Sequence, residues 1–308
     1  MGVTTTALSE RLRGWVRTAR GLLVPKTERQ RNRRRVIVLC VPFLLLATVA
    51  GAVPLWEMAK LSVSEAEFTT RGFTLEHYLR LVSVDYYRAV AVNTLWFAVA
   101  TTVGSLLVAV PVAHALEKYD LPGERALLTV ISFPNSLPGI VVAFMMIVLF
   151  GNSGLATNLA AAFTGRAPAT LAVATSVAGL FLGYLYSMVP RSLLLLRGTY
   201  AEVNTDAEEA ARALGATPWQ TFRYVTLPQI RPGLVGASVL AFRTAVAIFG
   251  TVLVLKAITP PVWTLQISRE LSNGFNIQLA SAMATVWFVA LFALTFLMLR
   301  YTSAEVSI

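Results

Sequence analysis

With 308 residues, of which 56% are hydrophobic and only 14% charged, the chain is too apolar for an ordinary water-soluble domain, in which charged residues make up about 25%. Its net charge of +10 would suit a nucleic-acid partner, but ten of the 26 lysines and arginines lie between Arg11 and Arg35, directly before the first apolar run. Such clustering is typical of the cytoplasmic flank of a membrane protein. The composition therefore predicts an integral membrane protein in contact with the lipid bilayer and excludes nucleic acid as a partner.

The first apolar run contains the only cysteine, Cys40, which excludes an intrachain disulfide and a cysteine-based metal site. A cleaved secretory signal has an apolar region of about 7 to 15 residues and a small-residue cleavage site, whereas this run is longer and no such site follows. We therefore expect a retained transmembrane helix.

Six segments reach the roughly 20 apolar residues that a membrane-spanning helix needs. They predict an all-α membrane protein divided into a basic arm (1–35), a first span with its external loop (36–92), a five-span core (93–300) and a short tail (301–308). The predicted spans are residues 36–56, 93–116, 127–150, 170–190, 234–255 and 279–299.

The distribution of basic residues predicts the orientation. The connection between the fourth and fifth predicted spans carries five arginines, whereas the connection before the fourth span carries only Arg166. Since cytoplasmic connections carry the excess of lysine and arginine, we expect both termini in the cytoplasm.

The third predicted span contains a helix-breaking sequence, SFPNSLPGI, with Pro134, Asn135, Pro138 and Gly139. Proline removes a backbone donor, and free backbone groups inside a membrane are tolerated where protein or a water-filled cavity satisfies them. A broken helix here indicates either a translocation pathway, in which Asn135 and Pro138 are the candidates, or a packing kink.

Residues 204–228, NTDAEEAARALGATPWQTFRYVTLP, have the pattern of two short capped helices between two membrane spans. Thr205 and Glu208 have the spacing of a reciprocal capping box, and Gly215 stands where a left-handed helix end is expected. Thr217, Pro218 and Gln220 repeat the start signal, and Pro228 and Pro232 are predicted to end the second helix before the fifth span.

Helices this short need a surface on which to pack. Small alanines and the large Trp219 and Phe222 favour docking of a partner, although folding against the membrane domain remains the alternative. A DNA-reading helix-turn-helix is disfavoured, because the three carboxylates of the segment equal its two arginines and the following Arg231, and both its ends are tied to membrane spans.

The stretch EAARALGATPWQTFRYVTLP resembles the EAA loop of the permease subunits of binding-protein-dependent ABC importers. In that pattern EAA is followed by three residues, a glycine, nine residues, an aliphatic residue, one residue and LP. The residues that match are Glu209, Ala210, Ala211, Gly215, Val225, Leu227 and Pro228, with both spacings kept.

The resemblance implies a five-helix type I ABC permease core preceded by one additional span, in a bacterial-type inner membrane. It also implies that the loop is a cytoplasmic coupling helix, in which Glu209 engages an ATPase subunit, Gly215 makes the turn, and Ala210 and Ala211 allow close contact. The implied partners are a second permease, which is a homologue or the same chain, an ATPase dimer and an extracytoplasmic solute-binding protein.

The chain has no phosphate-binding GxxxxGK[ST] loop, so this resemblance assigns ATP and magnesium to the ATPase. Its two histidines, His77 and His114, belong to no cluster suited to a metal or a catalytic triad and are expected to be polar surface or interface residues. We expect a transport subunit without an enzymatic activity or cofactor of its own.

For the substrate, LPGIVVAFMMIVLFGNSGL and TLQISRELSNGFNIQLASAMA resemble the permeases of polyamine, ferric-iron, phosphonate and sulfate importers more than those for sugars. Sulfate and molybdate permeases usually carry a glutamate where this chain has Ile248, which disfavours those two anions. A sugar importer remains an alternative. A secondary carrier is a weaker one, because no Asp or Glu lies within the predicted spans.

Arg243 lies near the middle of the fifth predicted span, where insertion scales disfavour arginine by about 2.5 to 3.5 kcal/mol. We expect it to line a wet pathway or a subunit interface, with packing between helices as the alternative. On a pathway it would favour an anionic substrate over a polyamine, unless the companion permease supplies a counter-charge.

Overall fold

The structure is a computed structural model that describes residues 28–65, 72–119, 122–259 and 261–305. These residues contain helices and no strand. Six of the helices are long and apolar enough to cross a membrane, which confirms the predicted all-α fold with six spans. Most of the predicted basic arm and the last three residues of the predicted tail lie outside the described residues.

The described chain divides into two units, Met1–Met58 and Ala59–Ile308. In the first unit, α2 (Glu28–Ala47) continues through a π turn, η1 (Thr48–Ala52), into α3 (Val53–Ser62), whose last residues belong to the second unit. The apolar stretch Arg35–Ser62 starts at the end of the arginine cluster, as predicted, but it runs further than residue 56.

Three long helices form the centre of the second unit: α5 (Asp85–Lys118), α10 (Val177–Tyr200) and α13 (Leu227–Ala247), each packed against the other two. Small residues let them approach closely: a Cβ added at Gly104 of α5 would lie 2.8 Å from the ring of Phe181. The central core is filled by apolar side chains from these helices and their neighbours, including Phe97, Leu180, Tyr184 and Val246.

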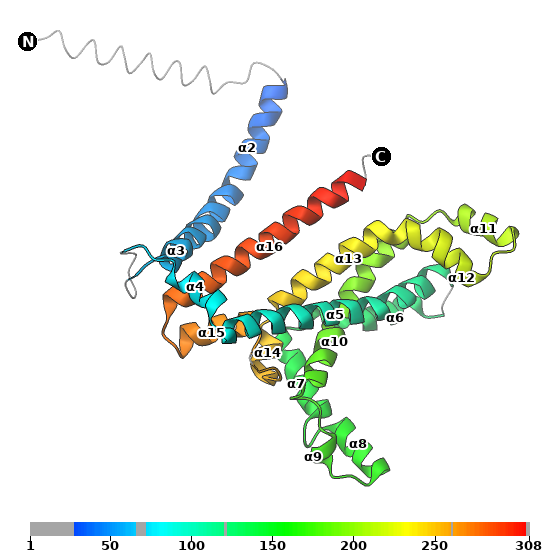
Figure 1. Ribbon diagram of the computed structural model, residues 1–308. Coiled ribbons are helices and arrows are strands. Elements are labelled where there is room, and N and C mark those ends of the chain that lie inside the picture. The colour runs from blue at the N-terminus through cyan, green and yellow to red at the C-terminus, as the bar shows by residue number, and fades with distance from the viewer. Residues whose placement is uncertain (1–27, 66–71, 120–121, 260, 306–308) are drawn as a thin grey trace, which may run out of the picture. The chain divides into compact units, whose positions relative to one another are not determined.

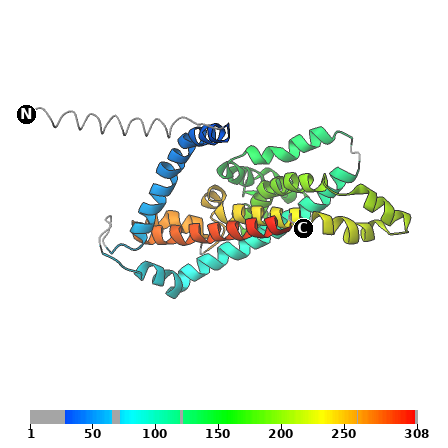
Figure 2. The same cartoon turned by 90° about the horizontal axis from the view of Figure 1, so that it is seen from above.

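Two further apolar clusters lie at opposite ends of α5. Toward its C-terminal end, Ala109 and Ala113 pack with Leu193 and Ile230. Toward its N-terminal end, α4 (Glu76–Ser83), α15 (Trp263–Ser272) and α16 (Ile277–Glu305) pack around Val90. Figure 1 shows α4, α15 and the start of α16 beside the N-terminal end of α5, and Figure 2 gives the same arrangement seen from above.

The third predicted span is broken where its prolines lie. α6 (Glu124–Ser132) passes into a 3₁₀ turn, η2 (Phe133–Ser136), and α7 (Gly139–Phe150) starts only after Pro138, whose backbone is extended. The apolar span is therefore Gly139–Thr164, formed by α7 and α8 (Leu155–Thr164), and the predicted bounds of 127–150 were wrong. Pro134 and Pro138 have no backbone N–H donor, so the regular hydrogen bonding of α6 ends before α7 begins.

The fifth predicted span is also interrupted, which the sequence analysis did not predict. α13 ends at Ala247, and a separate short helix, α14 (Gly250–Leu255), follows after Ile248 and Phe249. The fourth span is shifted: after α9 (Pro168–Leu171), α10 begins at Val177 with its N-terminus capped by Ser176 and continues past Pro190 to Tyr200. Proline does not end α10 because helices packed in a membrane protein can satisfy the freed backbone groups.

Candidate functional site

The segment between the fourth and fifth spans, residues 204–228, is called here the inter-span segment. Its first helix, α11 (Thr205–Ala213), is capped by Asn204, whose side-chain Oδ1 accepts hydrogen bonds from the backbone of Asp206 at 3.0 Å and Ala207 at 3.3 Å. The predicted capping box of Thr205 and Glu208 was therefore wrong. Asn204 supplies the cap one residue earlier, and the Glu208 carboxylate turns inward to stronger, charged partners.

The turn after α11 is a Schellman motif centred on Gly215. Gly215 N–H donates to the carbonyl of Arg212 at 2.9 Å, and Ala216 N–H donates to that of Ala211 at 3.1 Å. The φ of Gly215 is +88°, in the left-handed region, and a Cβ there would meet open space. Backbone conformation, not crowding, explains the glycine.

The second helix starts as predicted. In α12 (Pro218–Thr221), Thr217 and Gln220 form a complete capping box, with the backbone N–H of Thr217 donating to Gln220 Oε1 at 2.7 Å. The helix does not stop at Pro228 and Pro232, however, so that prediction was wrong. A π turn, η3 (Phe222–Thr226), leads directly into α13, and such local adjustments accommodate proline in membrane helices.

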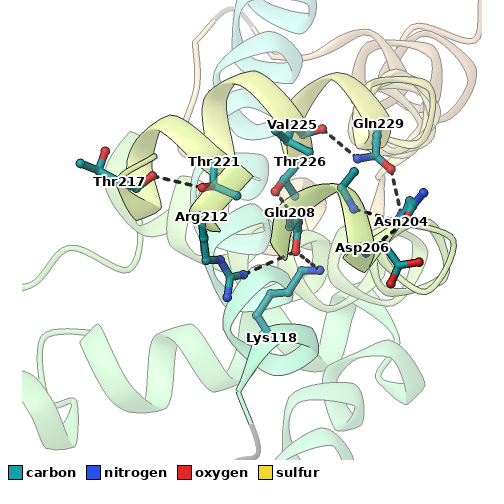
Figure 3. A network of polar contacts seen from close by, with 11 residues as sticks. Lys118, Asn204, Asp206, Glu208, Arg212, Thr217, Thr221, Val225, Thr226 and Gln229 are labelled. Atoms are coloured by element: carbon teal, nitrogen blue, oxygen red, sulfur yellow. Dashed lines mark hydrogen bonds and ion pairs between the residues drawn. The ribbon is translucent and has the colours of Figure 1, made fainter. Parts of the chain in front are cut away.

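The inside of the inter-span segment is organised around Glu208. Figure 3 shows the side chains of Lys118, Arg212 and Thr226 converging on its carboxylate. Lys118 Nζ lies 2.6 Å from Oε2, the Thr226 hydroxyl donates to Oε1 at 2.5 Å, and an Arg212 nitrogen lies 3.7 Å from Oε2. Glu208 is 2% exposed, and the sequence motif did not identify it.

The charged partners determine the protonation of Glu208. Burial by itself raises the pKa of this carboxyl group, but hydrogen bonds from Lys118 and Thr226 and the positive charges of Lys118 and Arg212 outweigh burial and lower the pKa below its usual value. Glu208 is therefore ionised at neutral pH, and its charge is neutralised locally.

The matched motif residues lie mostly on the outer side of the segment. Glu209, Ala210, Gly215 and Pro228 are exposed. Ala211, Val225 and Leu227 are half-buried, and Leu227 packs against the apolar cluster at the C-terminal end of α5. A hollow of about 400 Å³ opens beside the Gly215 turn, and its lining residues are Ala211, Leu214, Gly215, Ala216, Gln220 and Tyr224.

A larger apolar groove of about 710 Å³ lies between α5 and the helix formed by α12, η3 and α13. His114 lines it, with its ring centroid 5.2 Å from that of Phe222 and 5.8 Å from that of Tyr200. The other histidine, His77, has Nε2 3.1 Å from the carbonyl of Ser64. No group of three or more metal-ligating side chains occurs in the part of the chain that the structure describes.

The candidate pathway residues lie on different elements. Asn135 is half-buried in η2, and Pro138 is exposed at the start of α7. Arg243 is exposed on α13 and lines a hollow of about 510 Å³ with residues of α16, among them Phe288 and Phe292.

The interruptions of the third and fifth spans meet in space. α14 packs against α7, and the Thr251 hydroxyl donates to the carbonyl of Gly139 at 3.0 Å. A Cβ added at Gly250 would lie 3.0 Å from the backbone nitrogen of Ile140, so the two helix starts are in close backbone contact. In the sequence, Gly250 within AIFGT could have indicated this close contact.

A family profile described as the binding-protein-dependent transport system inner membrane component matches residues 105–307, which include the whole inter-span segment. The chain belongs to this family. Membership confirms the resemblance drawn from the EAA-like spacing and places the chain among multi-pass inner membrane proteins.

Two curated members of the permease family are similar in sequence. The thiamine transport system permease protein ThiP of Brucella suis biovar 1 is 30% identical over 219 residues, which are 70% of this chain and 40% of that protein. The sulfate transport system permease protein CysW of Synechocystis sp. is 30% identical over 212 residues, which are 66% of this chain and 74% of that protein. The chain thus spans less than half the length of the thiamine relative.

A solved structure has the same fold. It is a chain of the bacterial alginate ABC transporter in complex with an alginate pentasaccharide-bound periplasmic protein, with a TM-score of 0.74 and 15% sequence identity over 87% of this chain and 93% of that chain. At this identity, the similarity establishes the permease fold alone.

Proposed function

We propose that this chain is the transmembrane permease subunit of an ATP-driven importer and that its inter-span segment binds the ATPase. The observation that carries the proposal is the two-sided construction of this segment. Its inner side is held to the membrane helices through Glu208, whereas the motif residues Glu209, Ala210 and Gly215 are exposed on the outer side. ATP and magnesium would bind to the partner ATPase, and this chain would supply the pathway.

The exposed side has the properties of a protein interface. Leu214, Trp219 and Tyr224 are 90%, 65% and 70% exposed, and large aromatic side chains dominate the binding energy of many interfaces. The hollow beside Gly215 offers a recess that Leu214 and Tyr224 help to line. Glu209 adds a negative charge for a cationic group of the partner.

The complete importer would contain this chain, a second permease, an ATPase dimer and an extracytoplasmic solute-binding protein. The family description and the periplasmic protein of the alginate transporter support this assembly. With the inter-span segment facing the ATPase, both termini would lie in the cytoplasm.

The cargo is proposed to be a small polar or charged solute of the polyamine, phosphonate or iron type, and a sugar is the alternative. Relatives named for thiamine and for sulfate show that family membership leaves the cargo's charge open. Arg243 lies beside the hollow against α16 and would line the route or the permease interface. Normal uptake and assembly with Arg243→Leu would contradict that role. The neighbouring solute-binding protein's specificity would identify the cargo.

Copurification tests the ATPase assignment. The detergent-solubilised chain is expected to retain an ABC ATPase subunit, and Glu209→Lys is expected to weaken that complex about tenfold or more, because it reverses an exposed charge within the docking surface. Glu202→Lys is the matched control, since Glu202 is also exposed but lies outside the motif. Equal ATPase binding by the Glu209→Lys and unaltered chains would refute the docking assignment.

A further inference from the structure

Glu208 and Glu209 are consecutive, but only Glu209 belongs to the motif. Glu209 is exposed, whereas Glu208 is 2% exposed and is the only buried residue of α11. The remaining α11 side chains are exposed or half-buried. The Glu208 carboxylate, together with the hydrogen bond from the backbone N–H of Asn204 to Gln229 Oε1 at 2.9 Å, therefore holds this helix in place, with little contribution from apolar burial.

The partners of Glu208 come from different parts of the fold. Lys118 is the last residue of α5, a membrane-spanning helix, and its side chain is 12% exposed. Thr226 is the last residue of η3, directly before α13, and Arg212 lies one turn further along α11 than Glu208. A single buried carboxylate thus joins α11 to the ends of two membrane helices.

The neighbouring residue extends this connection to the fourth span. Glu117 accepts a hydrogen bond at 2.5 Å from Nε of Arg197 on α10, and Nη2 of the same guanidinium donates to Glu124 of α6 at 2.9 Å. The last two residues of α5 therefore bind α11 through Lys118 and α10 through Glu117, and Arg197 of α10 in turn binds α6. A displacement of α11 would act on α5 at a point already bound to its neighbours.

Charged hydrogen bonds are suited to attaching α11 to α5 because they are directional. Apolar contacts allow two helices to slide, whereas a carboxylate that accepts hydrogen bonds from Lys118 of α5 and Thr226 of η3 fixes both distance and angle. Because Glu208 is buried, the loss of one of its partners would leave a desolvated charge unpaired, which is energetically costly.

We propose that Glu208 is the positioning residue that transmits movement of the inter-span segment to α5. The connection between the inter-span segment and α5 is argued from the contacts of Glu208 alone. The assignment of the ATPase as the partner that moves the segment rests on the proposed function. The ATPase would displace α11 through its contact with Glu209, and Glu208 would transmit this displacement to the membrane helices through Lys118.

The first experiment measures the link in the purified full chain without any partner. A spin label is attached to a cysteine at exposed Ala213, after replacement of the native cysteine by Cys40→Ser. Glu208→Gln is expected to add a mobile component to the spectrum, whereas the matched control Glu202→Gln is expected to add none. An unchanged spectrum for Glu208→Gln would overturn the proposal.

A second variant covers the case in which Glu208→Gln does not fold. Lys118→Gln breaks the same ion pair from the α5 side and is expected to produce the same mobile component at position 213. An immobile label in folded Lys118→Gln protein would also overturn the proposal, because α11 would then be held by other contacts.

The second experiment uses the assembled transporter in proteoliposomes with its ATPase and binding protein. Glu208→Gln is expected to retain the ATPase but to move about tenfold less solute per ATP hydrolysed. A residue with a merely structural role would reduce the amount of folded transporter and leave that ratio unchanged, which would refute transmission. If no ATPase binds even the unaltered chain, the proposed function is refuted. The spin-label experiment still tests whether Glu208 connects α11 to α5.

Discussion

At the residue scale, the inter-span segment separates two roles between neighbouring glutamates. Successive side chains on a helix point about 100° apart, so Glu208 and Glu209 must face different surroundings. The structure places Glu208 among Lys118, Arg212 and Thr226 and leaves Glu209 exposed. One short sequence thus supplies both an internal attachment and an external charge.

The turn at Gly215 provides a residue-scale prediction. Gly215→Ala forces a side chain into the left-handed region and is expected to destabilise the turn by about 1 kcal/mol. Amide hydrogen exchange over residues 204–228 should then be about fivefold faster. Gly198→Ala is the control, because a Cβ there also meets open space but the residue lies within α10. Equal exchange in both variants would show that the turn tolerates alanine.

At the element scale, both broken spans use their interruptions to make contact with each other. α7 begins after Pro138 and α14 begins after Phe249, and their first residues meet at Gly139 and Gly250. Two helix starts approach this closely only where side chains are absent. The Thr251 hydroxyl then satisfies the Gly139 carbonyl, so the exposed backbone at the break has a partner.

Gly250→Ala tests this contact. The added methyl group would lie 3.0 Å from the Ile140 nitrogen and is expected to push α14 away from α7, at a cost of roughly 1 to 3 kcal/mol. The thermal unfolding midpoint of the detergent-solubilised protein should fall. In the control Gly183→Ala the nearest atom is a flexible Met146 side-chain carbon at 3.4 Å, so little change is expected. A midpoint unaffected by Gly250→Ala would mean that the helices can separate freely.

At the scale of the whole molecule, the inter-span segment and the connection from the end of α8 to α9 lie on opposite sides of the membrane in the predicted orientation. Arginines are frequent around the former and sparse around the latter. Each region has a nearly fully exposed apolar side chain: Leu214 is 90% and Phe163 is 89% exposed.

Cysteine labelling tests that orientation. In a Cys40→Ser background, Phe163→Cys is expected to react with a membrane-impermeant maleimide in intact cells, and Leu214→Cys is expected to react only after lysis. In cells that produce the chain without its ATPase the two positions are matched in exposure, so a difference in labelling reports sidedness. The reverse pattern would invert the topology.

The sequence by itself determined the all-α membrane class, six spans, the Gly215 turn and the Thr217–Gln220 cap. All of these depend on local properties: apolar length, a left-handed backbone position, and donors and acceptors three residues apart. The family pattern around Glu209 was equally local, because its spacings are read along the chain.

Only the tertiary structure decided what Glu208 does, where the fifth span breaks, and that the second short helix continues through Pro228 into α13. Lys118 lies 90 residues before Glu208, and Gly139 lies far from Thr251 in sequence. No local pattern encodes these contacts, because they exist only after packing brings separate helices together. Glu208 illustrates the difference: sequence spacing favoured a local cap, but a distant lysine offered the stronger, charged partner.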